Sequence, residues 1–153
     1  MKRFRFTLQA LLTLRQREEH VAMEAYAASL QRVRAEKVRL RSAEDDVAQA
    51  GEALRRYLAQ GAPAAEHAQR QNQYRLVDAR RLGAVHAVRQ AEMAAGQALD
   101  GMLHARRQRE IVEDCEVKQH QRYQREVAQA ETKWLDELAS RRAAPGVVWR
   151  GDS

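Results

Sequence analysis

The stretch LTLRQREEHVAMEAYAASLQRVRAEKVRLRSAEDDVAQAGEAL, residues 12–54, decides the fold. Every seventh residue in it is apolar except one, a glutamate; we call these positions the first heptad: Leu12, Glu19, Tyr26, Val33, Leu40, Val47 and Leu54. A period of seven stays close to two turns of an α-helix, so these side chains follow one face of a helix. Such a face predicts a left-handed supercoil with a partner helix.

A second heptad lies further along the chain and is made mostly of alanine: Val77, Ala84, Ala91, Ala98, Ala105 and Val112. Gly61 and Pro63 interrupt the helical pattern between the two heptads. Glycine readily takes the left-handed conformation that ends a helix, and proline fits the first turn of the next one. A connection this short returns the chain antiparallel to itself. The fold class is therefore predicted to be all-α, a long two-stranded antiparallel coiled-coil hairpin.

We expect a single coiled-coil module over residues 1–153. Its parts are a first arm at about 7–58, a turn at about 59–63, a second arm at about 64–142 and a loose tail at about 143–153. The second arm is the longer one, since each helical residue adds about 1.5 Å. Folding at Gly61 then pairs the N-terminus with the neighbourhood of Cys115, so the helix beyond about Val117 is expected to overhang.

Composition agrees with long solvated helices. Charged residues make up 31% and aromatic residues only 5%, with 7 Gly and 2 Pro in the whole chain. The net charge of +6 comes from arginines interleaved with acidic residues, which is typical of a solvated helix face. Non-specific contact with nucleic acid through charge alone stays an alternative, and so does a structural coiled coil that self-associates. No stretch approaches the roughly 20 apolar residues of a membrane span, so a cytoplasmic location is expected.

The chain offers little for catalysis or for a cofactor, and we expect neither an enzyme nor a metal site. Glu116 and His120 are four residues apart and share a helix face, yet helical metal sites need more ligands than this pair. Cys115 lies among acidic residues, which disfavour its thiolate. Phosphate-binding and dinucleotide-binding glycine patterns do not occur in the sequence.

Two parts of the chain carry a family resemblance. The first is FRFTLQALLTLRQREE at residues 4–19, a Phe-x-Phe that leads into leucines and then into an Arg/Glu run. The second is the ending, with RQREIVE at 107–113, RYQRE at 122–126 and ETKWLDELASR at 131–141. Together these segments resemble the flagellar export protein FliJ family, whose members are small coiled-coil stalk proteins of the type III export apparatus. The stalk protein of injectisomes is the nearest alternative.

The resemblance implies a non-enzymatic stalk or adaptor similar to the central stalk of rotary ATPases. Its implied partners are the hexameric export ATPase, the membrane protein of the export gate and the export chaperones. It also implies peripheral association with the inner face of the cell membrane through these partners. No specific nucleic acid and no transmembrane segment are expected.

Apolar residues at the two ends of the hairpin are the candidate partner-binding sites. One end has a set without an expected partner inside the chain, which we call the terminal surface: Phe4, Phe6, Leu8, Tyr123, Val127, Trp134 and Leu138. The set near the turn, the tip surface, consists of Leu54, Tyr57, Tyr74 and Val77. The terminal surface is expected to bind the ATPase. The two tyrosines either cap the hairpin against each other or bind the export gate, and the sequence leaves both readings open.

Overall fold

The computed structural model describes residues 3–144 and Gly146, and it contains two long helices. Helix α1 spans Gln9–Ala59 and helix α2 spans Ala64–Ala143, with no strand among the described residues. The all-α hairpin predicted from the sequence is thus confirmed. Helix α1 starts about two residues later than expected, after a turn in which the Leu12 amide donates to the Leu8 carbonyl at 2.9 Å. Most of the expected tail, Pro145 and residues 147–153, lies outside the described residues.

The turn between the helices forms as its glycine and proline predict. Gly61 has a φ of +67°, the left-handed conformation that a side chain would disfavour. The amides of Gln60 and Gly61 donate to the Tyr57 and Leu58 carbonyls at 3.2 and 3.4 Å, which satisfies the end of α1. The Pro63 carbonyl accepts from the His67 amide at 3.2 Å and starts α2. Local backbone hydrogen bonds therefore form at the C-terminal end of α1 and at the N-terminal end of α2.

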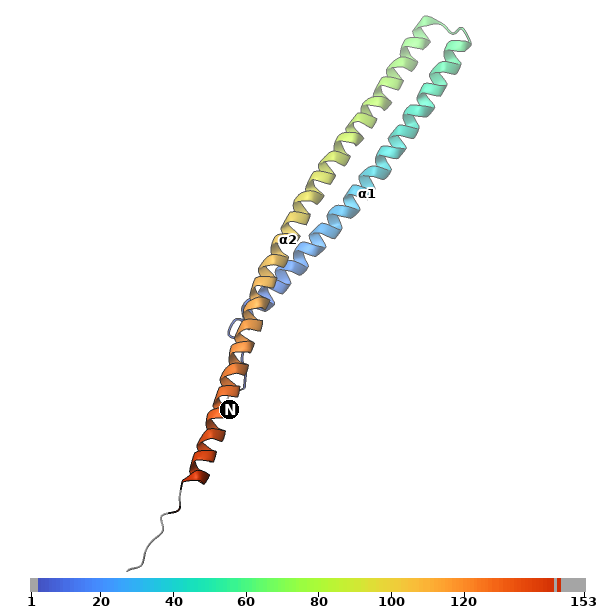
Figure 1. Cartoon of the computed structure of the whole chain (residues 1–153). Helices are drawn as coiled ribbons and strands as arrows, with labels where there is room; N and C mark the ends of the chain where they lie inside the picture. The colour runs from blue at the N-terminus through green and yellow to red at the C-terminus, as the bar shows by residue number, and fades with distance from the viewer. Residues whose placement is uncertain (1–2, 145, 147–153) are drawn as a thin grey trace, which may run out of the picture. The chain divides into compact units, whose positions relative to one another are not determined.

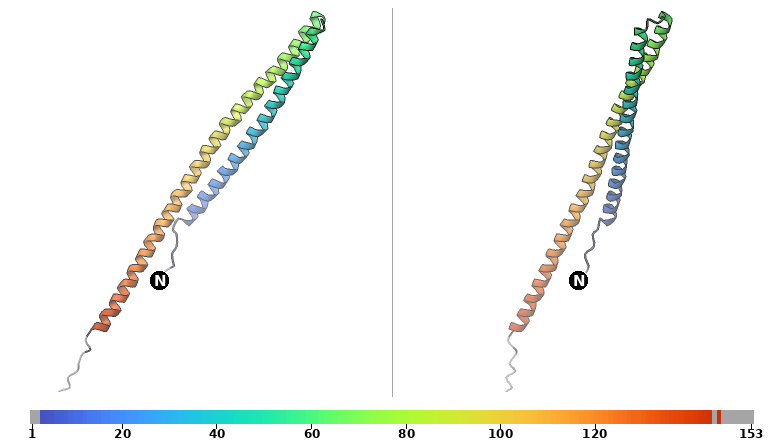
Figure 2. Two further views of the ribbon diagram at one scale, coloured as in Figure 1. Left: turned by 45° about the vertical axis from the view of Figure 1, so that its right-hand side comes forward. Right: turned by 90° about the vertical axis from the view of Figure 1, so that its right-hand side faces the viewer.

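Contacts between residues divide the chain into two units, of which the larger comprises Arg15–Gln108. Here α1 and α2 lie side by side and antiparallel, as the views in Figures 1 and 2 agree. The first-heptad positions of this unit are buried or half-buried, and so are those of the second heptad. Its most buried side chains are small, and they are Val33, Val88, Ala91 and Ala95. The helices thus approach each other along the predicted faces.

Two residues that flank the first heptad are more exposed than the sequence suggests. Met23 keeps 45% and Leu58 keeps 53% of its surface exposed, although each is apolar and lies three or four residues from a member of the first heptad. In a two-stranded coiled coil, only two positions of every seven-residue repeat face the partner helix. The alanines of the partner helix are too short to cover the side chains beside those positions. Flanking side chains therefore stay at the edge of the contact.

The smaller unit contains residues 3–14 and the part of α2 from Arg109 onward. Among the described residues of this unit, Leu12 and Val112 are buried. Phe4 packs on His120 and Tyr123, and Thr7 shares hydrogen bonds with Gln119 at 3.2–3.3 Å. The N-terminal segment was expected to pair with α2 only as far as about Val117. This prediction is wrong, because the pairing continues for about two more helical turns, to Tyr123. Residues 3–6 are not helical, and an extended residue spans about 3.3 Å where a helical one spans 1.5 Å.

Candidate partner-binding surfaces

The four residues of the tip surface all remain half-buried in the structure. Leu54 and Tyr57 lie in the last two turns of α1, whereas Tyr74 and Val77 lie in the third and fourth turns of α2. Their surroundings lie entirely within the unit Arg15–Gln108. The structure thus places the set near the turn, with part of each side chain open to solvent.

Tyr57 is held by two charged residues of α2 that lie outside the predicted tip surface. Its hydroxyl donates a hydrogen bond to the Glu66 carboxylate, and the guanidinium carbon of Arg70 lies 4.8 Å from the centre of its ring. Desolvation, the hydrogen bond and the negative charge of Glu66 raise the pKa of Tyr57 above 10.0, and the charge of Arg70 opposes this. The Tyr57 ring is therefore fixed across the turn by polar contacts as well as by packing.

Tyr74 has different neighbours from Tyr57. Its Cε2 atom lies 3.5 Å from the point where a Cβ on Gly51 would stand, so the ring packs over the bare backbone of that glycine. It also lines a small groove with five other residues: Ala50, Ala53, Leu54, Arg70 and Gln73. Arg70 therefore lies near both tyrosines: it contacts the ring of Tyr57, and it lines the groove beside Tyr74.

A shallow groove runs along the turn itself. It is lined by Tyr57, Leu58, Gly61, Ala62, Ala64 and His67. The Nδ1 atom of His67 is buried and has no hydrogen-bond partner among the described residues. None of the nine residues from Tyr57 to Ala65 carries a charge. The turn is thus a nearly apolar end between two charged helices.

The terminal surface is divided between two environments. Phe4 and Tyr123 contact each other with ring centres 5.5 Å apart, and the rings of Phe4 and His120 are nearly perpendicular with centres 4.9 Å apart. Phe6 is half-buried, whereas Leu8 stays 37% exposed. The structure thus brings Phe4 and Tyr123 together and uses them to hold the N-terminal segment on α2.

The last twenty residues of α2 form the other part of the terminal surface. From Gln124 to Ala143 every side chain is exposed except Val127 and Leu138, which are half-buried. Trp134 is 60% exposed, and Leu135, which is not part of the predicted terminal surface, is 58% exposed. An indole and a leucine side by side on an uncovered helix are unusual for a surface without a partner. This stretch therefore presents two large apolar side chains to solvent.

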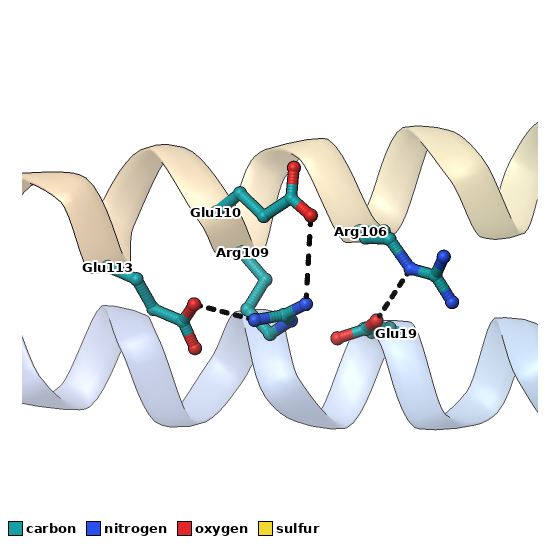
Figure 3. Close-up of polar contacts among 5 residues, drawn as sticks. All are labelled: Glu19, Arg106, Arg109, Glu110 and Glu113. Carbon is teal, nitrogen blue, oxygen red and sulfur yellow. Dashed lines mark hydrogen bonds and ion pairs between the residues drawn. The ribbon is translucent and has the colours of Figure 1, made fainter.

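Charged residues of the coiled coil also pair in ways that the heptads did not predict. Arg106 of α2 donates from Nε to Glu19 of α1 at 3.4 Å (Figure 3). Lys37 of α1 lies 3.4 Å from Glu92 of α2. In the smaller unit Arg109 lies 2.6 Å from Glu113 and 4.0 Å from Glu110. Figure 3 draws both pairs as dashed lines. The sequence did contain one indication of the Glu19–Arg106 pair, because Glu19 is the one charged residue in the otherwise apolar first heptad.

The histidines and acidic residues do not gather into a site. In the described part of the chain no group of three or more His, Cys, Asp and Glu side chains is placed to hold a metal ion. His120, the one histidine considered with Glu116, has its ring against Phe4. Among the same residues, neither helix has a stretch long and apolar enough to cross a bilayer.

Comparison with known proteins identifies a family. The model of the family described as flagellar FliJ protein matches residues 4–146. No curated protein and no solved structure gives a significant match. The matched range covers both helices and the turn, and it includes every residue of the tip surface and of the terminal surface.

Proposed function

The chain belongs to the flagellar FliJ protein family, and from that premise we propose that it is a non-enzymatic stalk or adaptor of the flagellar type III export apparatus. In this role it couples the ring of the export ATPase to the membrane protein of the export gate. It also handles export chaperones. It acts in the cytoplasm, peripherally at the inner face of the cell membrane. The family match favours the flagellar apparatus over the injectisome alternative.

The observation that carries the proposal is the uncovered end of α2. Trp134 and Leu135 expose more than half of their surfaces, and Val127 and Leu138 lie one or two turns away on the same helix. Large aromatic side chains in such positions commonly dominate binding energy between proteins. A helix that presents an apolar face along its length suits insertion into a groove or a ring of subunits. We therefore assign this stretch to the ATPase.

The tip surface is assigned to the gate protein. Tyr57 and Tyr74 are the largest apolar side chains near the turn, and both residues are half-buried. Tyr57 is already ordered by Glu66 and Arg70, so little side-chain freedom would be lost on binding. Because the two surfaces share no residue, their two partners are expected to bind independently.

The test uses the full chain with paired substitutions. Trp134→Ala with Leu138→Ala is expected to weaken binding of the purified export ATPase by about tenfold or more, because truncated aromatic anchors typically cost ~2 kcal/mol. These substitutions leave Phe4 on His120 and Tyr123. Tyr57→Ala with Tyr74→Ala is expected to lose binding of the gate protein while ATPase binding persists.

A matched control removes two other exposed apolar side chains. Met93→Ala with Leu103→Ala trims residues that are 68% and 37% exposed in the unit Arg15–Gln108. This variant should bind both partners like the unaltered chain, with the same helical circular dichroism in all variants. ATPase binding that survives the loss of Trp134 and Leu138 contradicts the assignment of the terminal surface.

A further inference from the structure

The positive charge of the larger unit is concentrated in one part of the coiled coil, which we call the basic band. It consists of residues 31–41 of α1 and of the stretch 85–95 that lies opposite on α2, where Lys37 is 3.4 Å from Glu92. The band holds six Lys or Arg and two Asp or Glu residues, a net charge of +4. The rest of the larger unit holds ten basic and ten acidic residues. Counted over both helices, the net charge of this unit therefore lies in the band.

Both acidic residues of the band are already engaged by cations of the same band. Glu36 lies 3.0 Å from Arg39, and Glu92 lies 3.4 Å from Lys37. The other four cations are exposed, and none of them forms an ion pair with a described residue: Arg32, Arg34, Arg41 and Arg89. The band thus presents four cations whose charge is not offset by a neighbouring carboxylate.

A groove between the two helices lies within the band. It has a volume of about 340 Å³ and is lined by six residues: Arg32, Glu36, Ala87, Gln90, Ala91 and Ala94. Three of the four residues that α2 contributes are alanines, whose short side chains leave the space beside the helix contact unfilled. The groove therefore has room for larger apolar side chains of another helix.

Two rows of arginines lie on opposite sides of α1 in the band. Arg32 and Arg39 are seven residues apart, so they share a helix face and are spaced about 10.5 Å along the axis. Arg32 lines the groove, and Arg39 donates a hydrogen bond to Glu36, which also lines it. Arg34 and Arg41 have the same spacing but lie about 200° further around the axis. We call the first pair the groove arginines and the second pair the outer arginines.

We propose that the basic band docks an acidic amphipathic helix of a partner protein. The partner helix lies along the groove with its apolar side chains over the alanines and its carboxylates on the groove arginines. Guanidinium groups bind carboxylates in paired hydrogen bonds, and carboxylates seven residues apart on a helix match the spacing of the groove arginines. A nucleic acid would use the cations but would leave the apolar groove unfilled. The contact goes beyond the proposed function, because neither the tip surface nor the terminal surface includes a residue of the band.

The test measures binding of the purified full chain to two labelled synthetic peptides by fluorescence anisotropy. Each peptide is a helix of three identical seven-residue repeats. Every repeat of the acidic probe has two glutamates, two leucines and three alanines, and the neutral probe has glutamine in place of each glutamate. We expect the chain to bind the acidic probe about tenfold or more tightly than the neutral one. The difference should shrink as salt is added, since exposed charges are screened over about 10 Å at 0.1 M salt.

Two variants with the same loss of charge locate the contact. Arg32→Gln with Arg39→Gln removes the groove arginines and is expected to weaken binding of the acidic probe about fivefold or more. Arg34→Gln with Arg41→Gln removes the outer arginines and should weaken it about twofold or less. A third variant, Ala87→Gln, keeps the charge but fills part of the groove, so it should weaken binding about as much as the first. All three should keep the helical circular dichroism of the unaltered chain.

Equal losses for the groove and outer arginines would show that the attraction is diffuse, and they would overturn the proposal. Unchanged binding by the Ala87→Gln variant, or no preference of the unaltered chain for the acidic probe, would overturn it as well. A short double-stranded DNA is measured in parallel. If it binds more tightly than the acidic probe, the band is assigned to nucleic acid and the proposal fails. None of these measurements uses the ATPase or the gate protein, so their outcome is distinct from the test of the proposed function.

Discussion

Glu19 of α1 accepts a hydrogen bond from Arg106 of α2 at 3.4 Å, across the contact between the two helices. Glu19 is the one charged member of the first heptad, and its side chain is only 12% exposed, whereas that of Arg106 is 43% exposed. A carboxylate in such a position favours the alignment of helices that supplies it with a cationic donor. The alanine-rich second heptad gives few large side chains that would otherwise fix the alignment. This pair therefore helps to set the register of the hairpin.

The role of the Glu19–Arg106 pair is tested by removing one partner at a time. Arg106→Ala deprives a mostly buried carboxylate of one donor and is expected to lower the free energy of unfolding by about 1–2 kcal/mol. Glu19→Leu removes the buried charge and should leave thermal stability unchanged or higher, but it should permit additional associated species in sedimentation velocity. Wild-type stability of the Arg106→Ala variant would show that the pair does not contribute.

The contact between the helices is tested at two valines of α1. Val33 is 9% exposed and packs with Ala91 and Ala95, whereas Val38 is 63% exposed. Val33→Asp places a carboxylate in an apolar contact and is expected to cost about 3 kcal/mol or more. Val38→Asp should change stability by only about 0.5 kcal/mol, because Val and Asp have similar helix propensities. Equal urea midpoints for the two variants would rule out the helix face as described.

Glycines inside α2 should be replaceable, unlike the glycine of the turn. An added Cβ meets nothing within 4 Å at Gly83, Gly96 or Gly101. Each change to alanine at these three positions is expected to raise the free energy of unfolding by roughly 0.5–1 kcal/mol, through helix propensity. Gly61→Ala should lower it by about 1 kcal/mol, since the φ of +67° disfavours a side chain although space is available. Urea unfolding of the four variants checks the expected increase for the three glycines of α2 and the expected decrease for Gly61.

Tyr57 should make stability depend on pH in the alkaline range. Its pKa in the folded chain is raised above 10.0, so the folded state holds the phenolic proton more tightly than the unfolded state does. The resulting stability is present below pH 10 and is lost as the pH rises through the folded pKa. Tyr57→Phe lacks this contribution, so its melting temperature should fall less steeply above pH 10. If the melting temperatures of the two proteins fall equally steeply above pH 10, the raised pKa of Tyr57 is contradicted.

Residues near Tyr57 show what could and could not be predicted about the tip. Gly61 and Pro63 identified the turn, because each residue type is suited to one backbone conformation. The contacts of Tyr57 with Glu66 and Arg70 were not predictable in the same way. They depend on how far each helix is rotated about its axis where the chain reverses, and the heptad pattern does not define this rotation. The binding roles of the tip and terminal surfaces stay predictions.

By itself the sequence determined the helices, the turn and the face that each helix buries. These features follow from local rules, because helix propensity, the seven-residue period and the Gly–Pro interruption act over a few residues. Only the tertiary structure decided where the pairing of the N-terminal segment ends. Phe4 reaches His120 and Tyr123 because residues 3–6 leave the helix and extend, which lengthens their span. It likewise decided that Glu19 meets Arg106, since that contact joins residues 87 positions apart and depends on the register of the whole hairpin.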